Sequence, residues 1–318
     1  MSARPARAPL ARRDLLLGGA ALLAALAADA ERRPIVEPVI DTHQHLWDLE
    51  RLRPPWLAGG GPLARSHLME EYLREAGGLS IQKTVYMEVD VDPAQHVAEA
   101  EYVVGICERP DNPMVAAVVG GRPADPAFAD YLARFRGVRC VKGVRQVLHV
   151  PSTPRGHCLS DEFVRGVRLL GRAGLSFDVC LPAAYLPDCA RLAELCPDTR
   201  LVLDHCGNPS VLATDLSQWR RDMDAIARRP NVDCKVSGIV ATAKPGAWKP
   251  ADLAPIVLHC AEAFGRNRIV WASDWPVCTA AATLRQWLLA AKEIVAGWPA
   301  GDRRKLFHDN ALRVYRLG

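Results

Sequence analysis

The sequence predicts an α/β fold, a (β/α)8 TIM barrel formed by a single domain. Eight short apolar runs rich in Val and Ile alternate with longer amphipathic segments, which is the pattern of parallel strands joined by helical crossovers. Polar residues of catalytic type follow three of these runs, as expected at the carboxyl-terminal face of a parallel barrel. The 318 residues could make two domains by length alone, but barrels of this kind reach that size as one.

Each apolar run gives the position of an expected strand. The eight strands are expected at residues 36–43, 83–89, 114–119, 139–145, 176–181, 200–205, 232–237 and 269–273. Two irregular segments rich in Pro and Gly, 53–62 and 242–250, each follow a strand. They are therefore expected to be βα loops on the active-site face, where such loops shape the substrate pocket.

Capping signals indicate where the helices begin and end. Asp92-Pro93 and Asp125-Pro126 each place a proline at the first helical position, and Gly174 is a typical helix terminator. The helices are expected at residues 92–107, 125–136, 160–173, 187–195, 216–229, 251–264, 281–295 and 302–315. The last of them is expected to close over the barrel.

Composition and charge indicate which kinds of partner the protein is expected to bind. Hydrophobic residues make up 49% of the chain and charged residues 24%, which is ordinary for a globular enzyme. The formal net charge is only +4, and no Lys/Arg-rich run is interleaved with aromatic residues. A nucleic-acid partner is therefore not expected, and the predicted partner is a small-molecule substrate.

Residues 1–30 have the pattern of a twin-arginine export signal. Arg12-Arg13 precede an apolar stretch that ends at Ala28 and is too short to span a bilayer comfortably. Ala28-Asp29-Ala30 offers a small-x-small cleavage site. The prediction is a periplasmic or exported domain over residues 35–318, with no stable membrane anchor once the signal is removed. The alternative is an uncleaved tail on a cytoplasmic protein.

The ten cysteines do not follow the pattern of a disulfide scaffold. Cys140, Cys180 and Cys234 lie inside apolar strand runs, where cysteine behaves as a small buried hydrophobe. The chain contains no CxxC pair, which argues against a cysteine zinc site. A bridge between Cys189 and Cys196 stays open as an alternative.

The motif Ile40-Asp41-Thr42-His43-Gln44-His45 follows the first apolar run. Residues two apart in an extended chain point the same way, so His43 and His45 are expected to project from one face at the end of the strand. Two neutral imidazoles side by side can bind a divalent metal, or can polarise a carbonyl oxygen directly. The alternative is a pair of polar residues in a loop.

Two further residues of catalytic type end other strands. His205 follows the run Leu201–Asp204, and Asp274 follows the run that begins at Ile269. A carboxylate that faces a polarised carbonyl can take a proton from water, so Asp274 is the candidate general base. The alternatives are a helix N-cap for Asp274 and a core histidine for His205.

Several charged residues on other strands are candidates for substrate binding. They are Arg145, Lys142, Lys235 and Glu88. Strand alternation sends Lys142 and Arg145 to opposite faces unless Gly143 marks a bulge, and Arg145 lies nearer the carboxyl-terminal rim. Arg suits bidentate binding of a carboxylate, although an outer salt bridge is the alternative for each cation. Asp178 and Tyr185 are further candidates for the pocket wall. The remaining histidines are interpreted as surface or core residues, and His149 is the one expected nearest to the site.

Six blocks in this order and spacing resemble the amidohydrolase-related family, amidohydrolase 2, in its sugar-lactone and pyrone-dicarboxylate lactonase branch. They are IDTHQHLWD, KGVR, FDVCL, LVLDHCGNP, NVDCKVSGI and IVWASDWPV, and the resemblance covers about residues 37–317. The resemblance implies a metal-dependent-hydrolase-like barrel. It also implies that Asp274 is the catalytic base and often a metal ligand, and that His205 is the mid-barrel histidine. FDVCL holds no lysine and CKVSG no second histidine, which argues against a binuclear centre.

The predicted function is hydrolysis of a small polar lactone, either a sugar lactone or a related carboxylated one. Asp274 would activate water, while His43, His45 and His205 would stabilise the oxyanion directly or through one divalent metal such as zinc. The same four residues are the candidate metal ligands. The alternatives are a zinc-dependent decarboxylase of an aromatic or unsaturated carboxylate, an amidase or other esterase, and a non-catalytic barrel that binds a sugar acid.

Overall fold

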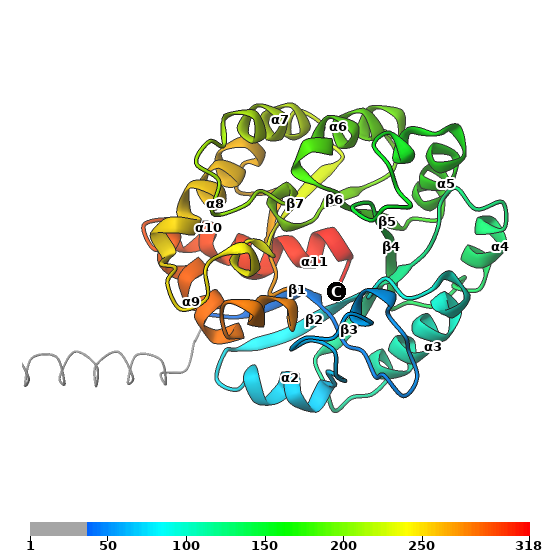
Figure 1. The fold of residues 1–318 in the computed structure, drawn as a ribbon, viewed down its shortest axis with the longest axis horizontal. Coiled ribbons are helices and arrows are strands. Elements are labelled where there is room, and N and C mark those ends of the chain that lie inside the picture. Colours follow the sequence, from blue (N-terminus) through cyan, green and yellow to red (C-terminus); the bar gives the residue numbers. More distant parts are fainter. Residues whose placement is uncertain (1–36) are drawn as a thin grey trace, which may run out of the picture.

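Residues 37–318, described by a computed structural model, form a barrel of eight parallel strands surrounded by helices (Figure 1). Each strand pairs with the next one along the chain. The strands are β1 Val39–Gln44, β2 Ile81–Met87, β3 Met114–Gly120, β4 Val141–Val147, β5 Ser176–Cys180, β6 Leu201–Leu203, β7 Val232–Val236 and β8 Ile269–Trp271. The predicted (β/α)8 fold is confirmed, and every predicted strand overlaps an observed one. The predicted export signal, residues 1–30, lies outside the described residues.

The helices form the outer layer of the barrel, and the last segment of the chain turns inward. They are α2 Met69–Glu75, α3 His96–Cys107, α4 Phe128–Ala133, α5 Asp161–Arg172, α6 Leu186–Leu195, α7 Ser217–Ala227, α8 Pro250–Phe264, α9 Leu284–Ile294, α10 Ala300–Arg304 and α11 Asn310–Tyr315. All the predicted helices overlap observed ones, but α2 was not predicted. It has only seven residues, and Leu68 at its start supplies no side-chain cap. Within residues 37–318, none of the helices combines the length and the hydropathy that crossing a membrane would require.

The barrel closes where β8 meets β1. Gln44 forms a parallel bridge with Trp275, the Asp274 amide donates to the His43 carbonyl at 2.9 Å, and the His45 amide donates to the Trp275 carbonyl at 2.8 Å. The Thr42 hydroxyl adds a bond to the Trp271 carbonyl at 2.8 Å. Residues more than 200 positions apart in the chain are thereby held side by side, so the first and last strands build one site.

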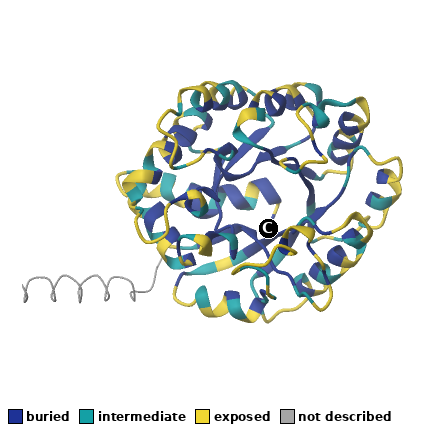
Figure 2. Ribbon diagram, in the orientation of Figure 1, coloured by how far each residue is buried: buried dark blue, intermediate teal, exposed yellow. Residues whose placement is uncertain are grey.

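The fold contains two hydrophobic cores. The larger one fills the space between the strands and the outer helices, and Figure 2 shows buried strands ringed by helices whose outer faces are exposed. The smaller core lies inside the barrel and joins β1, β2, β3, β6 and β8 to the carboxyl-terminal segment. Each fully buried Val or Ile of such a core contributes about 1.5–3 kcal/mol relative to an exposed one.

Helix α11 closes the amino-terminal end of the barrel, as its central place in Figure 1 indicates. Val314 and Tyr315 are buried in the inner core, and the Tyr315 hydroxyl donates to Asp178 Oδ2 at 2.8 Å. Lys142 belongs to this end of the molecule, since its ammonium donates to the Arg316 carbonyl at 3.1 Å. The sequence-based expectation that Lys142 faces the substrate is therefore wrong. Strand alternation sends Lys142 outward and Arg145 inward.

All ten cysteines are free thiols in the structure. Eight are buried, among them Cys180 and Cys234, as expected for small apolar residues. Cys140, which was also expected to be buried, is only partly buried. The candidate pair Cys189 and Cys196 is not bridged, and the Cys196 thiol instead contacts the Val164 carbonyl at 3.8 Å.

Candidate active site

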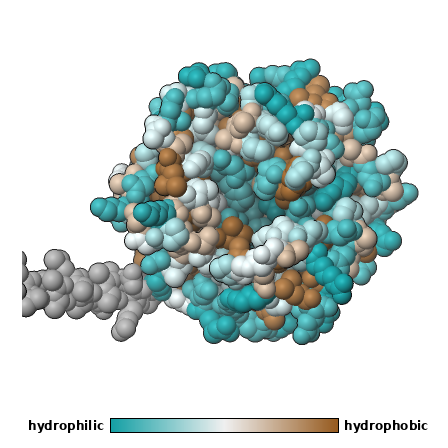
Figure 3. All heavy atoms as spheres, viewed as in Figure 1, coloured by the Kyte–Doolittle hydropathy of each residue, from teal (hydrophilic) through white to brown (hydrophobic). Residues whose placement is uncertain are grey.

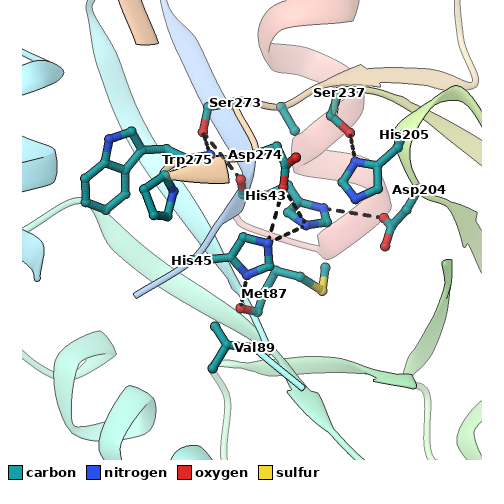
Figure 4. Close-up of polar contacts among 12 residues, drawn as sticks. His43, His45, Met87, Val89, Asp204, His205, Ser237, Ser273, Asp274 and Trp275 are labelled. Atoms are coloured by element: carbon teal, nitrogen blue, oxygen red, sulfur yellow. Dashed lines mark hydrogen bonds and ion pairs between the residues drawn. The ribbon is translucent and has the colours of Figure 1, made fainter. Parts of the chain in front are cut away.

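His43 and His45 lie at the carboxyl end of β1 with their side chains together, as the i, i+2 spacing predicts (Figure 4). Their Nε2 atoms are 3.1 Å apart. The His45 Nδ1 atom lies 2.9 Å from the Met87 carbonyl oxygen. Because a carbonyl only accepts, this nitrogen carries the proton of the neutral ring. The His45 Nε2 lone pair therefore points at the space that the two imidazoles share.

Asp274 reaches the same space from the end of β8. Its Oδ1 atom is 3.5 Å from His43 Nε2 and 3.3 Å from His45 Nε2. The residue has φ +59°, a left-handed conformation that Asp tolerates better than most residues do. Its neighbour Ser273 is held below by Asp41, which accepts the Ser273 amide at 2.8 Å and the hydroxyl at 2.5 Å. Backbone strain at a supported turn thus aims the carboxylate at the imidazoles.

His205 approaches from the end of β6, with its ring centroid 4.6 Å from that of His43. Its Nδ1 atom is 3.0 Å from the Ser237 hydroxyl, which fixes the ring orientation. The ring packs directly on Gly238, where a Cβ atom would come within 2.4 Å of His205 Nδ1. Gly238 has φ +68°, so both the close approach and the backbone conformation require glycine.

Asp204, the neighbour of His205, is a site residue that the sequence reasoning missed. It is fully buried, and its Oδ1 atom lies 3.5 Å from His43 Nδ1 and 3.0 Å from Lys235 Nζ. Strand alternation would place only one of these two neighbours in the site. Because β6 ends at Leu203 and His205 has φ +54°, both side chains face it. The adjacent acid and histidine in LVLDHCG were the available signal.

Two groups of donor atoms could hold a metal ion: His43, His45 and Asp274, and His43, Asp204 and His205. In the second group the Lys235 ammonium already takes the place of a cation, 3.2 Å from His43 Nδ1 and 3.0 Å from Asp204 Oδ1. The first group offers two imidazole nitrogens and one carboxylate oxygen, which is a ligand set of catalytic zinc sites. The residues present therefore fit one divalent metal. His205, expected among its ligands, lies outside this group.

A chain of buried, paired charged side chains lies next to the site. Arg145 Nε donates to Glu88 Oε1 at 2.6 Å, and Arg145 Nη1 lies 3.4 Å from Asp204 Oδ2. On the other side of Asp204, Lys235 donates to Asp178 Oδ2 at 2.7 Å. Buried charges are tolerated when they are paired and hydrogen-bonded in this way. The positive charges of Arg145 and Lys235, expected to face the substrate, are engaged by carboxylates of the protein.

Burial and this charge chain set the protonation of the centre. Burial, reinforced by the Lys235 charge, holds the pKa of His43 well below its usual range, so the ring is neutral and able to act as a ligand. Burial alone would raise the pKa of Asp204, but Lys235 and His43 outweigh it and hold the pKa of that carboxyl well below its usual range. Burial also lowers the pKa of His205.

The donor cluster opens into a cavity of about 350 Å3. Figure 3 shows the hollow at the centre of this face of the barrel, with hydrophilic residues at its bottom. His45, His205, Asp274 and Arg145 line it together with His149, which confirms the position expected for that histidine. The two irregular loops contribute Trp56 and Thr242, as βα loops should. Asp178 and Tyr185, also expected at the pocket wall, are not among the described residues that line the cavity. Asp178 lies in the barrel interior, beside Lys235.

A parallel barrel with a His and Asp donor cluster at the carboxyl ends of its strands defines the class of metal-dependent barrel hydrolases. A family model described as amidohydrolase matches residues 40–317. The chain belongs to the amidohydrolase family and is an enzyme of that superfamily.

Three known proteins locate the chain within the family. The L-fucono-1,5-lactonase of Burkholderia multivorans is 30% identical over 299 residues, which are 87% of this chain and 96% of the relative. A crystal structure of a Burkholderia multivorans amidohydrolase with bound zinc superposes with a TM-score of 0.80 at 27% identity, over 88% of this chain and 100% of that one. A putative 2-pyrone-4,6-dicarboxylic acid hydrolase from Pseudomonas putida shares the fold, with a TM-score of 0.69 at 20% identity over 89% and 99% of the chains. The resemblance to the lactonase branch is thereby confirmed.

Proposed function

We propose that the protein hydrolyses a small polar lactone. The observation that carries this proposal is the convergence of His43 Nε2, His45 Nε2 and Asp274 Oδ1, with 3.1–3.5 Å between these atoms. His45 and Asp274 line an open cavity, and His43 lies buried behind them. Two imidazoles that can hold a cation and one carboxylate suit ester hydrolysis by water. A cation held there would stabilise a developing oxyanion, and the carboxylate can accept the water's proton.

Asp274 is the general base of this proposal. It is 4% exposed and lines the cavity, so it meets a water or substrate there but little bulk solvent. When water attacks the lactone carbonyl, Asp274 takes its proton and later passes it to the leaving alkoxide, which opens the ring to a hydroxy acid. Both steps use one carboxylate, because the leaving oxygen remains tethered to the same product.

The imidazoles set the geometry of the metal centre at which the carbonyl would bind. His45 keeps a lone pair toward the centre because its other nitrogen donates to Met87, and Ser237 holds the His205 ring in place. Arg145 adds positive potential at the cavity wall. A divalent metal held by His43, His45 and Asp274, for which we propose zinc, would supply Lewis-acid polarisation of the carbonyl and a more acidic bound water.

The comparisons support a lactone as the substrate. The relative at 30% identity acts on a sugar 1,5-lactone by its name, and it is matched over 96% of its length. The structure with bound zinc supports zinc as the ion. The decarboxylase alternative uses the same donor set but would release carbon dioxide, so product analysis separates the two reactions.

The test is a hydrolysis screen of six-membered sugar lactones and carboxylated lactones. Acid release is followed with a pH indicator and carbon dioxide is measured separately, with the enzyme reconstituted with zinc or treated with a chelator. We expect acid release without carbon dioxide. Carbon dioxide from an aromatic carboxylate, with no lactone opened, would replace the proposal by the decarboxylase. No lactone opened in any condition would refute it.

A further inference from the structure

An indole ring stands at the mouth of the cavity. Trp56 lines it and is 44% exposed, which makes it one of the few large apolar side chains on the described surface with such exposure. The ring is nevertheless fixed. Its Nε1 donates to the Val89 carbonyl at 2.7 Å, and it packs edge-on against buried Trp47 with 5.4 Å between the centroids. A rigid, exposed aromatic face beside a polar site can pack against the C–H face of a ring-shaped ligand without losing conformational entropy.

Asp90 shares this wall with Trp56. Its φ of +49° is a strained left-handed conformation, held because the Asp90 amide donates to Glu88 Oε2 at 2.7 Å. One carboxylate oxygen, Oδ1, accepts from Arg122 at 3.1 Å. The other, Oδ2, has no hydrogen-bond partner among residues 37–318. A strained residue at a cavity wall is a mark of function, and a free carboxylate oxygen there accepts a hydroxyl hydrogen.

The charges around Asp90 disfavour an anionic group at this part of the wall. Among the described residues that line the cavity, Arg145 is the single Lys or Arg, and it is already paired with Glu88 and Asp204. Asp90 and Asp274 add two carboxylates to the same wall. Away from the centre where a divalent metal would sit, a substrate carboxylate beside Asp90 would find no described cation that is free of a protein carboxylate, and such desolvated like charges are costly. A neutral ring with hydroxyl groups suits both the aromatic face and the free acceptor.

We propose that Trp56 and Asp90 form a recognition subsite for a neutral, polyhydroxylated lactone ring. Trp56 packs on the apolar face of the ring, and Asp90 Oδ2 accepts a hydrogen bond from a ring hydroxyl. Lactones that carry carboxylates are rejected. The lactone part of this statement rests on the proposed function, but recognition of the hydroxylated ring is a matter of binding and is tested without turnover.

The experiment uses the full chain. Titration calorimetry measures the binding of lactams, which copy the lactone ring and resist hydrolysis. The probes are a six-membered polyhydroxylated lactam, 2-piperidone without hydroxyls, and 2-pyridone-4,6-dicarboxylate. The variants are Trp56→Ala and Asp90→Asn, since Asn also tolerates the left-handed backbone. Arg122→Gln is the matched control, because it breaks the same ion pair and leaves the Asp90 carboxylate in place.

We expect the parent to bind the hydroxylated lactam at least tenfold more tightly than either of the other probes. Asp90→Asn should weaken that binding about tenfold, the scale of one hydrogen bond to a charged group, without changing the weak binding of 2-piperidone. Trp56→Ala should weaken the binding of the hydroxylated lactam by a similar factor. Arg122→Gln should leave the affinity for this lactam within threefold of that of the parent.

Three results would overturn the subsite: tighter binding of the dicarboxylate, equal losses for the lactams with and without hydroxyls in Asp90→Asn, or no lactam binding by the parent. Failure of the proposed function looks different. In that case the hydroxylated lactam binds through Trp56 and Asp90, but no lactone is opened.

Discussion

The Lys235 ammonium lies 3.2 Å from Nδ1 of His43, in the closed interior of the barrel. It also lies 2.7 Å from Asp178 Oδ2 and 3.0 Å from Asp204 Oδ1. Asp204 Oδ1 is in turn 3.5 Å from His43 Nδ1, so the lysine and the acid hold the same side of the imidazole, and His43 Nε2 faces His45 Nε2 at 3.1 Å. One lysine thereby helps to orient a central histidine and lies beside two buried acids whose charges it offsets.

Replacing Lys235 with Met should destabilise the fold strongly, because buried Asp178 would lose its ammonium partner and buried Asp204 would keep only the longer 3.4 Å contact to Arg145. The expected loss is about 3–5 kcal/mol in the free energy of unfolding. Lys142→Met is the matched control, since Lys142 is half-buried at the other end of the barrel and contacts only a carbonyl of the described chain. Urea unfolding of both variants at pH 7 provides the measurement. A loss for Lys235→Met no larger than that for Lys142→Met would show that the buried chain of charges is not needed for stability.

Replacing Asp274 with Asn should abolish turnover and leave the fold intact. Asn keeps the shape and tolerates φ +59°, but it cannot take a proton from water. The expected loss in kcat is on the order of 10²–10⁴-fold, the contribution of a general base. The measurement is lactone hydrolysis together with the melting temperature. A variant that is active within a factor of three of the parent would remove Asp274 from the mechanism.

The residues that the sequence located correctly are those set by strand geometry. His43, His45 and Asp274 each end a strand, and parallel strands in a barrel bring their carboxyl ends to one face. Period-two alternation also separates Arg145 from Lys142, which faces the opposite end of the molecule. Where the backbone is a regular strand, the sequence pattern therefore predicts the direction in which each side chain points.

The residues that the sequence did not reveal lie where the backbone is irregular. Asp204 enters the site next to the left-handed conformation at His205, and Trp56 lies in the short 3-10 helix Pro55–Leu57 within an irregular segment. No local signal gives the φ angle of a non-glycine residue or the direction in which a loop folds back. The pairing of Arg145 with Glu88 was also hidden, because it joins residues 57 positions apart through the closure of the barrel.

Glu99 should make stability fall as pH rises. Burial, together with the nearby Glu88 charge, raises the pKa of Glu99 from 4.5 to about 8, so the folded protein holds this proton at pH 7 and the unfolded chain does not. Its contribution is fully present below about pH 4.5 and is lost as pH rises through about 8. The neutral carboxyl accepts from the Val89 amide at 2.8 Å and from the Tyr86 hydroxyl at 2.9 Å.

Glu99→Gln keeps a neutral side chain at every pH, so its stability relative to the parent should increase between pH 5 and 8. The slope of that difference should approach about 1.4 kcal/mol per pH unit, which is the value for one proton. Urea unfolding at several pH values is the measurement, and Glu101→Gln, exposed on the same helix, is the control. A difference between Glu99→Gln and the parent that is constant from pH 5 to 9 would contradict the prediction.

Arg145→Met should reduce the hydrolysis of all lactones by a similar factor. The guanidinium is 4% exposed, donates to Glu88 Oε1 and to the Glu88 carbonyl at 2.6 Å, and also contacts Asp204 and His43. Its loss leaves Glu88 as an uncompensated buried charge and releases the support of His43, which every substrate needs. The measurement is kcat/KM for a hydroxylated sugar lactone and for an unsubstituted six-membered alkyl lactone, in the parent and the variant. Equal losses on both, with a lower melting temperature, are expected for a residue that acts through Glu88 and His43. A loss confined to the hydroxylated lactone, with unchanged kcat and stability, would instead make Arg145 a substrate-binding residue, the role expected from its position in the sequence.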